Sequence, residues 1–220
     1  MTASRGDPAA AQPIGERIDV ALDLHAAALV KAYFDPGGPF AGATFDTLGD
    51  NEPDHVGADD LLAVTLLDVR VPALVVRRVL DQDQPAIGAA IGAIPDSVDL
   101  WDATDEELAP ALAAWDRLTA YHGVGPVIAG KLLARKRPRL VPIFDSVVGA
   151  VVNAPQGEYW VTLRSCLANN HRHVRLGELR PAGLSPKVSN LRIFDVITWM
   201  RFSRGRNARA CRQHLGVSDE

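Results

Sequence analysis

Apolar residues recur every three to four positions through most of the chain, the spacing of one face of a helix. Nothing indicates a hairpin of strands, so the pattern predicts a mainly α fold. Residues 58–69 include β-branched residues that also permit a strand. Pro110 falls inside one predicted helix, where proline kinks or breaks the backbone, and glycines and prolines over 171–186 predict an irregular linker. The predicted helices span 17–34, 58–69, 72–80, 85–94, 104–121, 158–169 and 189–202, and two more begin at Pro126 and after Asp145.

Composition and pattern divide the chain into three parts. Residues 1–16 contain prolines and acids without an apolar pattern, so we expect a disordered leader. Residues 17–205 are expected to form one helical globular unit. Within it, an acidic N-terminal lobe covers about 17–103 and a basic lobe covers about 104–205. Residues 206–220 are expected to form an exposed basic tail.

Composition also excludes several classes of protein. No run of about 18 apolar residues is present, so we expect no transmembrane helix, and the N-terminus lacks the apolar core of a secretory signal. Cys166 and Cys211 are too few for a disulfide framework or a four-cysteine iron–sulfur cluster, and they suit the cytoplasm. No histidine and cysteine spacing matches a zinc module. We therefore expect a cytoplasmic protein without a metal or cofactor.

Charge is divided unevenly along the chain. Residues 1–119 hold 7 Lys/Arg and 21 Asp/Glu, whereas residues 120–213 hold 16 Lys/Arg and 4 Asp/Glu. Such asymmetry is typical of proteins that bind a polyanion such as DNA. The alternative is that the two halves pack together and neutralise each other. The basic residues that follow a glycine turn near the middle of the chain favour the polyanion.

That glycine turn, His122-Gly123-Val124-Gly125, separates two predicted helices and is the best candidate for a binding site. Backbone N–H groups at such a turn face outward at a helix N-terminus, where the helix dipole attracts phosphate. Basic residues downstream are predicted to contact further DNA phosphates without reading the base sequence. The alternative is a purely structural helical hairpin with a solvated basic face. The predicted DNA contacts are Gly123, Val124, Gly125, Lys131, Arg135, Lys136, Arg137 and Arg139.

Residues 112–152 resemble the helix–hairpin–helix superfamily of base-excision DNA glycosylases, in a bacterial branch. The resemblance rests on the Gly-Val-Gly turn, on Pro142 and on Asp145, which follows the first glycine by 22 residues. It implies a helical glycosylase-like fold with a helix–hairpin–helix motif, double-stranded DNA as the partner, and Asp145 as the catalytic carboxylate. Cleaving a base from its sugar builds positive charge on the sugar, which an ionised carboxylate stabilises.

The chain departs from that family at one informative position. Members that also cut the sugar–phosphate backbone carry a lysine two positions after the second glycine, where this chain has Val127, and Lys131 lies one helical turn further on. The resemblance therefore implies a monofunctional glycosylase that leaves an abasic site. It identifies no base-pocket residue. The aromatic candidates for stacking on a flipped base, each equally suited to a core, are Trp101, Tyr121, Tyr159, Trp160 and Trp199.

Asp145 has a second interpretation, because it directly precedes a predicted helix. An aspartate there caps the helix without any catalysis. Two alternatives to an enzyme therefore stay open. One is a non-catalytic helix–hairpin–helix module that grips DNA. The other is a protein-interaction domain whose acidic and basic halves pair within or between chains.

Overall fold

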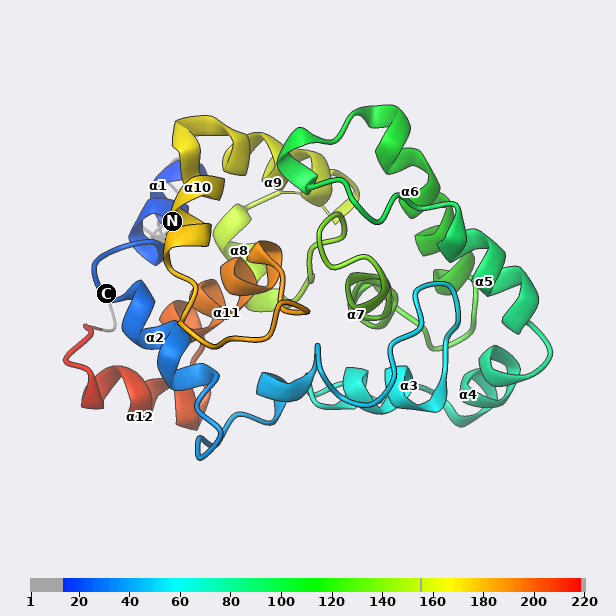
Figure 1. Cartoon of the computed structure of the whole chain (residues 1–220), viewed down its shortest axis with the longest axis horizontal. Coiled ribbons are helices and arrows are strands. Elements are labelled where there is room, and N and C mark those ends of the chain that lie inside the picture. Colours follow the sequence, from blue (N-terminus) through cyan, green and yellow to red (C-terminus); the bar gives the residue numbers. More distant parts are fainter. Residues whose placement is uncertain (1–13, 155, 219–220) are drawn as a thin grey trace, which may run out of the picture.

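The structure is a computed structural model that describes residues 14–154 and 156–218 (Figure 1). These residues form α-helices and short 3₁₀ turns without a strand, so the predicted mainly α class is confirmed. None of the helices in this part of the chain is long and apolar enough to cross a membrane. The α-helices are α1 (Ile14–Ala21), α2 (Ala26–Tyr33), α3 (Ala58–Thr65), α4 (Ala73–Leu80), α5 (Gln84–Gly92), α6 (Asp105–Thr119), α7 (Pro126–Lys136), α8 (Ser146–Val152), α9 (Tyr159–Ala168), α10 (Arg172–Glu178), α11 (Asn190–Phe202) and α12 (Arg206–His214).

Two groups of helices share one hydrophobic core. Helices α3 to α7 pack on one another, whereas α1 and α2 pack against α8 and α11 (Figure 1). The main apolar core runs from Ile18 to Ile197 and draws residues from both groups, so the groups form one unit. The predicted division near residue 103 does not match this arrangement, because the first two helices join the C-terminal helices. A smaller apolar cluster, which includes Tyr33 and Met200, lies between α2, α11 and α12.

Local sequence signals account for the best-predicted helices. Thr104 accepts a hydrogen bond from the Glu107 backbone, and the Glu107 side chain bonds back to Thr104, which makes the capping box that starts α6. Ser189 caps α11 in the same position. Pro110 does not break α6, which continues to Thr119. Buried contacts of the flanking turns, such as that of Leu108, hold the helix across the missing hydrogen bond.

The first predicted helix, over residues 17–34, is divided in two. The Asp23 carboxylate accepts a hydrogen bond from the backbone N–H of His25, and this local bond competes with the helical one. The helix therefore ends at Ala21 and restarts at Ala26. The predicted leader is too long by three residues, because α1 begins at Ile14; residues 1–13 lie outside the described part of the chain.

Two segments predicted to be irregular or exposed are helical. The predicted linker over residues 171–186 contains α10, whose Arg172 is buried and bonded to Asp19. The predicted tail over residues 206–220 contains α12, which packs on α2 and α11 and buries Ala208. Sequence periodicity is weak in both helices because each is short and rich in arginine, and contacts with distant parts of the chain hold them.

Candidate active site

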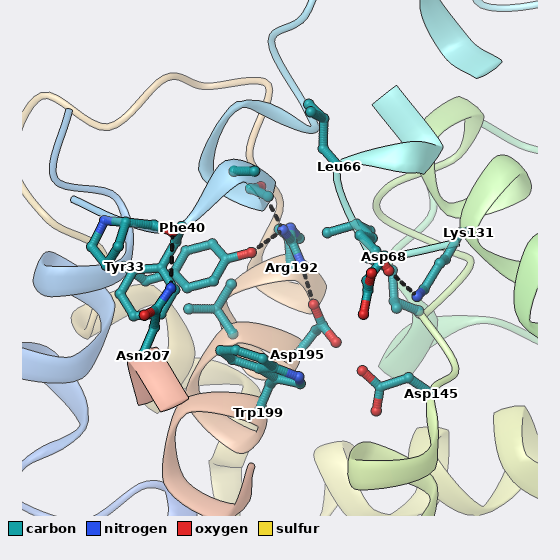
Figure 2. Close-up of a pocket in the computed structure, with 16 residues that line it drawn as sticks. Tyr33, Phe40, Leu66, Asp68, Lys131, Asp145, Arg192, Asp195, Trp199 and Asn207 are labelled. Carbon is teal, nitrogen blue, oxygen red and sulfur yellow. Dashed lines mark hydrogen bonds and ion pairs between the residues drawn. The ribbon is translucent and has the colours of Figure 1, made fainter. Parts of the chain in front are cut away.

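Asp145 caps α8 and also faces a pocket. Its Oδ1 accepts hydrogen bonds from the backbone N–H groups of Val147 and Val148, at 2.9 and 2.8 Å. These bonds satisfy two of the amides that the first turn of a helix leaves unpaired, so the capping interpretation is confirmed. Both bonds use the same oxygen, and Oδ2 has no hydrogen-bond donor in the described part of the chain. Figure 2 shows the carboxylate directed into the pocket.

The pocket has a volume of about 250 Å³ and lies between α2, α7, α11 and the first turn of α12. Aromatic rings form the end opposite Asp145 (Figure 2). Tyr33 stacks on Phe40 with ring centroids 5.1 Å apart, and the Trp199 ring stands edge-on to both, at 6.3 and 6.1 Å. The wall therefore presents flat apolar surface suited to a planar ligand.

Charged side chains form the other end of the pocket. Lys131, on the inner face of α7, is 5% exposed and donates from Nζ to the carbonyl oxygen of Leu67, at 2.7 Å. Burial lowers the pKa of the Lys131 amine, although the negative charges of Asp145 and Asp195 oppose that shift. Asp68 lies beside it with φ at 60°, a left-handed conformation that aspartate tolerates better than most residues. An amine whose pKa is lowered by burial thus lies in the same pocket as the carboxylates of Asp68, Asp145 and Asp195.

Arg192 on α11 links several of the segments that line the pocket. The side chain is buried and donates to the carboxylates of Asp46 and Asp195, to the Tyr33 hydroxyl at 2.9 Å and to the Gly42 carbonyl at 2.8 Å. One guanidinium therefore fixes the aromatic wall and one of the pocket carboxylates at the same time. Such a network is rigid because every donor has a partner.

Asp195 is the most strongly perturbed carboxylate in the pocket. Burial raises the pKa of Asp195 to about 7, because the loss of hydration outweighs the attraction of Arg192, and the charge of Asp145 adds to the increase. The group therefore exchanges a proton near neutral pH. Pairs of carboxylates in unlike environments are typical of sites that perform acid–base chemistry.

Three of the predicted DNA contacts are buried instead. Arg135, Lys136 and Arg137 are at most 4% exposed. Asp60 pairs with both Arg135 (2.6 Å) and Lys136 (2.5 Å), and Asp54 pairs with Arg137 (2.5 Å). The prediction that these three residues bind phosphate is wrong, since their charges are already used to attach the 45–57 segment to α7. Lys131 is also buried, and its amine faces the pocket rather than the surface.

The charge asymmetry of the sequence has the same explanation. Within the described part of the chain, eight of the eleven ion pairs join a residue before position 120 to one after it. The two halves thus neutralise each other within one molecule, as the alternative interpretation expected. Arg139 belongs to this set, but its pair with Asp99 (2.8 Å) lies at the surface, where the guanidinium remains half exposed.

The glycine turn lies at the surface, and only its first glycine requires that residue type. Gly123 has φ at 82°, and a Cβ there would come within 2.9 Å of Pro72 Cγ. Gly125 is the N-cap of α7 with an extended backbone, and a Cβ there would meet nothing within 4 Å. Val124 is buried and donates its N–H to the Tyr121 carbonyl. Val124 therefore anchors the turn, and Gly123 and Gly125 remain accessible.

Sequence reasoning found Asp145 and Lys131 but missed most of the pocket. Of the five aromatic candidates for stacking, only Trp199 lines it. A signal existed in α11, where Arg192 and Asp195 are three positions apart, and so on one face, among mostly apolar residues. Charged residues are almost never fully buried unless they are paired, so this spacing indicates a buried ion pair. The remaining pocket residues come from separate segments and carry no common local pattern.

Two further observations bear on what the pocket can bind. No group of three or more His, Cys, Asp or Glu residues that could hold a metal ion occurs among the described residues. Cys166 and Cys211 are free thiols outside the pocket. The polar side chains that line the pocket carry carboxylates, an amine, a guanidinium, a hydroxyl and an amide.

Comparison with known proteins identifies a family by sequence. A family model described as a family of unknown function (DUF6308) matches residues 26–202. The chain belongs to this family. The match runs from the first residue of α2 to the last of α11, so it contains Asp145, Lys131 and Asp195 but not Asn207 of α12. No curated protein and no solved structure matches the chain.

Proposed function

We propose that this protein binds duplex DNA and removes a single base from it, with Asp145 as the carboxylate that acts on the glycosidic bond. The position of Asp145 carries the proposal. The residue caps α8 through one oxygen and leaves the other free at an open pocket with an aromatic wall. The resemblance of the glycine turn and its spacing from Asp145 to the helix–hairpin–helix glycosylases supports the same role.

The size and lining of the pocket fit one nucleobase. A volume of about 250 Å³ corresponds to roughly eight waters at about 30 Å³ each, close to the number of non-hydrogen atoms in a base. Enzymes that act on a base extrude it from the duplex, stack it on aromatic rings and bond its polar edge. Phe40 and Trp199 supply rings, and Asp195 and Asn207 supply hydrogen-bonding groups.

The reaction assigns a role to each carboxylate. The bond between the sugar C1′ and the base nitrogen breaks, and its electron pair leaves with the base. Ionised Asp145 stabilises the positive charge that develops on the sugar and accepts the proton of the water whose oxygen adds to C1′. Asp195, with its pKa near 7, donates a proton to the departing base and recovers one from solvent. Asp145 releases to solvent the proton that it took from water.

The test is an excision assay with Asp145→Asn as the decisive variant. Asparagine caps a helix about as well as aspartate, so the variant keeps its fold while losing the charge. Duplexes that each carry one uracil, hypoxanthine, alkylated purine or oxidised base are incubated with protein and then cleaved with alkali at abasic sites. We expect the wild type to release at least one base, and Asp145→Asn to bind the same duplex with at least about a hundredfold lower excision rate.

The alternatives have separate outcomes in this assay. Duplex binding without excision of any base overturns the enzyme and leaves a DNA-binding module. Absence of binding to duplex DNA even at low salt overturns both, since phosphate contacts strengthen as salt falls. In that case the protein-interaction alternative stands.

Lys131 supports a second activity at the same pocket. The position of Val127 implied a glycosylase without strand cleavage, yet the structure places another amine, that of Lys131, beside Asp145. In this alternative the amine adds to C1′ of the abasic sugar aldehyde and water leaves as the imine forms. A pocket carboxylate then takes a proton from C2′, the C3′–O bond breaks, and the phosphate leaves with the electron pair, which cleaves the strand. Borohydride then traps a covalent protein–DNA adduct in the wild type but not in Lys131→Gln. Without trapping and without cleavage before alkali, the enzyme is monofunctional.

A further inference from the structure

Three arginines near the start of α12 are exposed, and one residue of the same turn lines the pocket. Arg204, Arg206 and Arg209 make no ion pair within the described part of the chain, in contrast to the buried cations of α7. Asn207, in the first turn of α12, lines the pocket and donates to the Pro39 carbonyl. Exposed arginines without an ion pair in the described residues therefore precede and follow a pocket residue along the chain.

We propose that Arg204, Arg206 and Arg209 form the main phosphate-contacting surface of this protein and hold the DNA strand whose base enters the pocket. This inference rests on the proposed function and replaces the buried α7 residues as the source of DNA contacts. The sequence placed Arg206 and Arg209 in a predicted tail and Arg204 at the end of the predicted globular unit. Their availability follows from the packing of α12, which turns Ala208 and Arg212 inward.

The geometry of α12 suits a strand of phosphates. Arg206 and Arg209 are three positions apart on the helix, so their Cβ atoms lie on one face about 5–6 Å apart. Extruding a base brings the phosphates on either side of its sugar to the mouth of the pocket that receives it. Arginine binds phosphate through two parallel N–H groups, which suits this task better than a single ammonium would.

A second contact with the strand is available at the opposite end of the pocket. Figure 2 shows Asn207 at the aromatic end and Lys131 and Asp145 at the other end. Asp68 lines that second end, and the chain continues from it through exposed Arg70 to Pro72, which touches Gly123 of the glycine turn. The α12 arginines and the glycine turn therefore flank the pocket, and a bound strand would cross it.

The experiment compares two double variants that each remove two positive charges from the surface. Arg206→Gln with Arg209→Gln removes the proposed contacts, whereas Arg175→Gln with Lys187→Gln removes two exposed cations outside the pocket. Binding of the full chain to a fluorescent duplex with one abasic-site analogue is measured over a series of KCl concentrations. All four positions are at the surface, and equal melting temperatures establish that both variants are folded.

We expect the α12 variant to bind at least about tenfold more weakly at low salt, and the slope of log affinity against log salt to fall by about 2, since each phosphate contact contributes about 0.9. The control variant is expected to retain the slope of the wild type. An unchanged slope in the α12 variant, or an equal loss in both variants, overturns the inference while the proposed function stands. Failure of the wild type to bind the duplex overturns both.

Discussion

Two basic segments of this chain look alike in sequence and differ completely in the folded protein. Residues 131–137, in α7 and its C-cap, carry four cations, and residues 204–209 carry three. The α7 cations are buried and bonded to carboxylates or carbonyl groups of the N-terminal half. The arginines at 204–209 are exposed. A run of basic residues therefore indicates a binding surface only after acidic partners within the same chain have been accounted for.

The physical reason is the cost of removing a charge from water. An isolated buried cation costs several kcal/mol, so it is found only where a carboxylate or several carbonyl groups replace its hydration. The segment before α3 and the first turn of α3 supply these partners to α7, through Asp54, Asp60 and backbone carbonyl groups. No acidic segment lies against the outer face of α12 in the described part of the chain. Its arginines remain hydrated and available.

The largest effect is expected from Asp60→Asn, which removes the shared partner of Arg135 and Lys136. Asp60 is 1% exposed, and its loss leaves two cations buried without their carboxylate. We expect the free energy of unfolding to fall by about 3–5 kcal/mol in urea titrations. Asp81→Asn, at an exposed residue, serves as the control and is expected to change it by less than about 0.5 kcal/mol. Equal losses of stability in Asp60→Asn and Asp81→Asn would contradict the conclusion that the α7 cations depend on a buried carboxylate.

A smaller, pH-dependent effect is expected at Asp195, where a charge is buried with incomplete compensation. Because the pKa of Asp195 is raised to about 7 in the folded protein, the folded form keeps a proton that the unfolded chain releases near pH 4. The contribution of Asp195 to the free energy of unfolding is therefore present at low pH and is lost as pH rises towards 7. Between pH 5 and 8 we expect the wild type to lose roughly 2 kcal/mol more than Asp195→Asn. Parallel pH profiles for the two proteins would contradict this assignment.

The two glycines of the turn are expected to differ in how much a substitution destabilises the protein. Gly123→Ala is expected to reduce the free energy of unfolding by about 1–2 kcal/mol, because alanine is strained at positive φ and its Cβ meets Pro72. Gly125→Ser is expected to change it by no more than about 0.5 kcal/mol, since the backbone there is extended and serine is a good N-cap. Thermal melts of both variants measure the two losses of stability. A larger loss at Gly125 would show that its backbone is constrained in a way the structure does not indicate.

The smallest effects are expected at exposed arginines. Arg139→Ala breaks a surface pair with Asp99 and should cost no more than about 1 kcal/mol. Arg209→Ala, which has no ion pair within the described residues, should cost less than about 0.5 kcal/mol. Urea titrations of both variants provide the measurement. A loss comparable to that of Asp60→Asn in either variant would place a buried contact where the structure has a hydrated side chain.

Local sequence signals predicted the helices more completely than they predicted the residues of the pocket. The predicted starts of two helices, at residues 104 and 189, agree with α6 and α11, where Thr104 and Ser189 are the N-caps. The division of the first helix at Asp23 was missed, since a single side-chain bond overrides helical periodicity there. Helix α12 was missed because its stability comes from packing against α2 and α11.

The sequence by itself determined the mainly α class, the glycine turn, and Asp145 as a residue that starts a helix. These features depend on neighbours within a few positions. Only the tertiary structure decided which charges are available, because each α7 cation is paired with a group more than sixty positions away. It likewise assembled the pocket, where Tyr33, Asp68, Asp145 and Asp195 meet from four separate segments. Long-range packing leaves no local pattern, so it set both the burial of the basic segment and the place of Asp145 in a pocket.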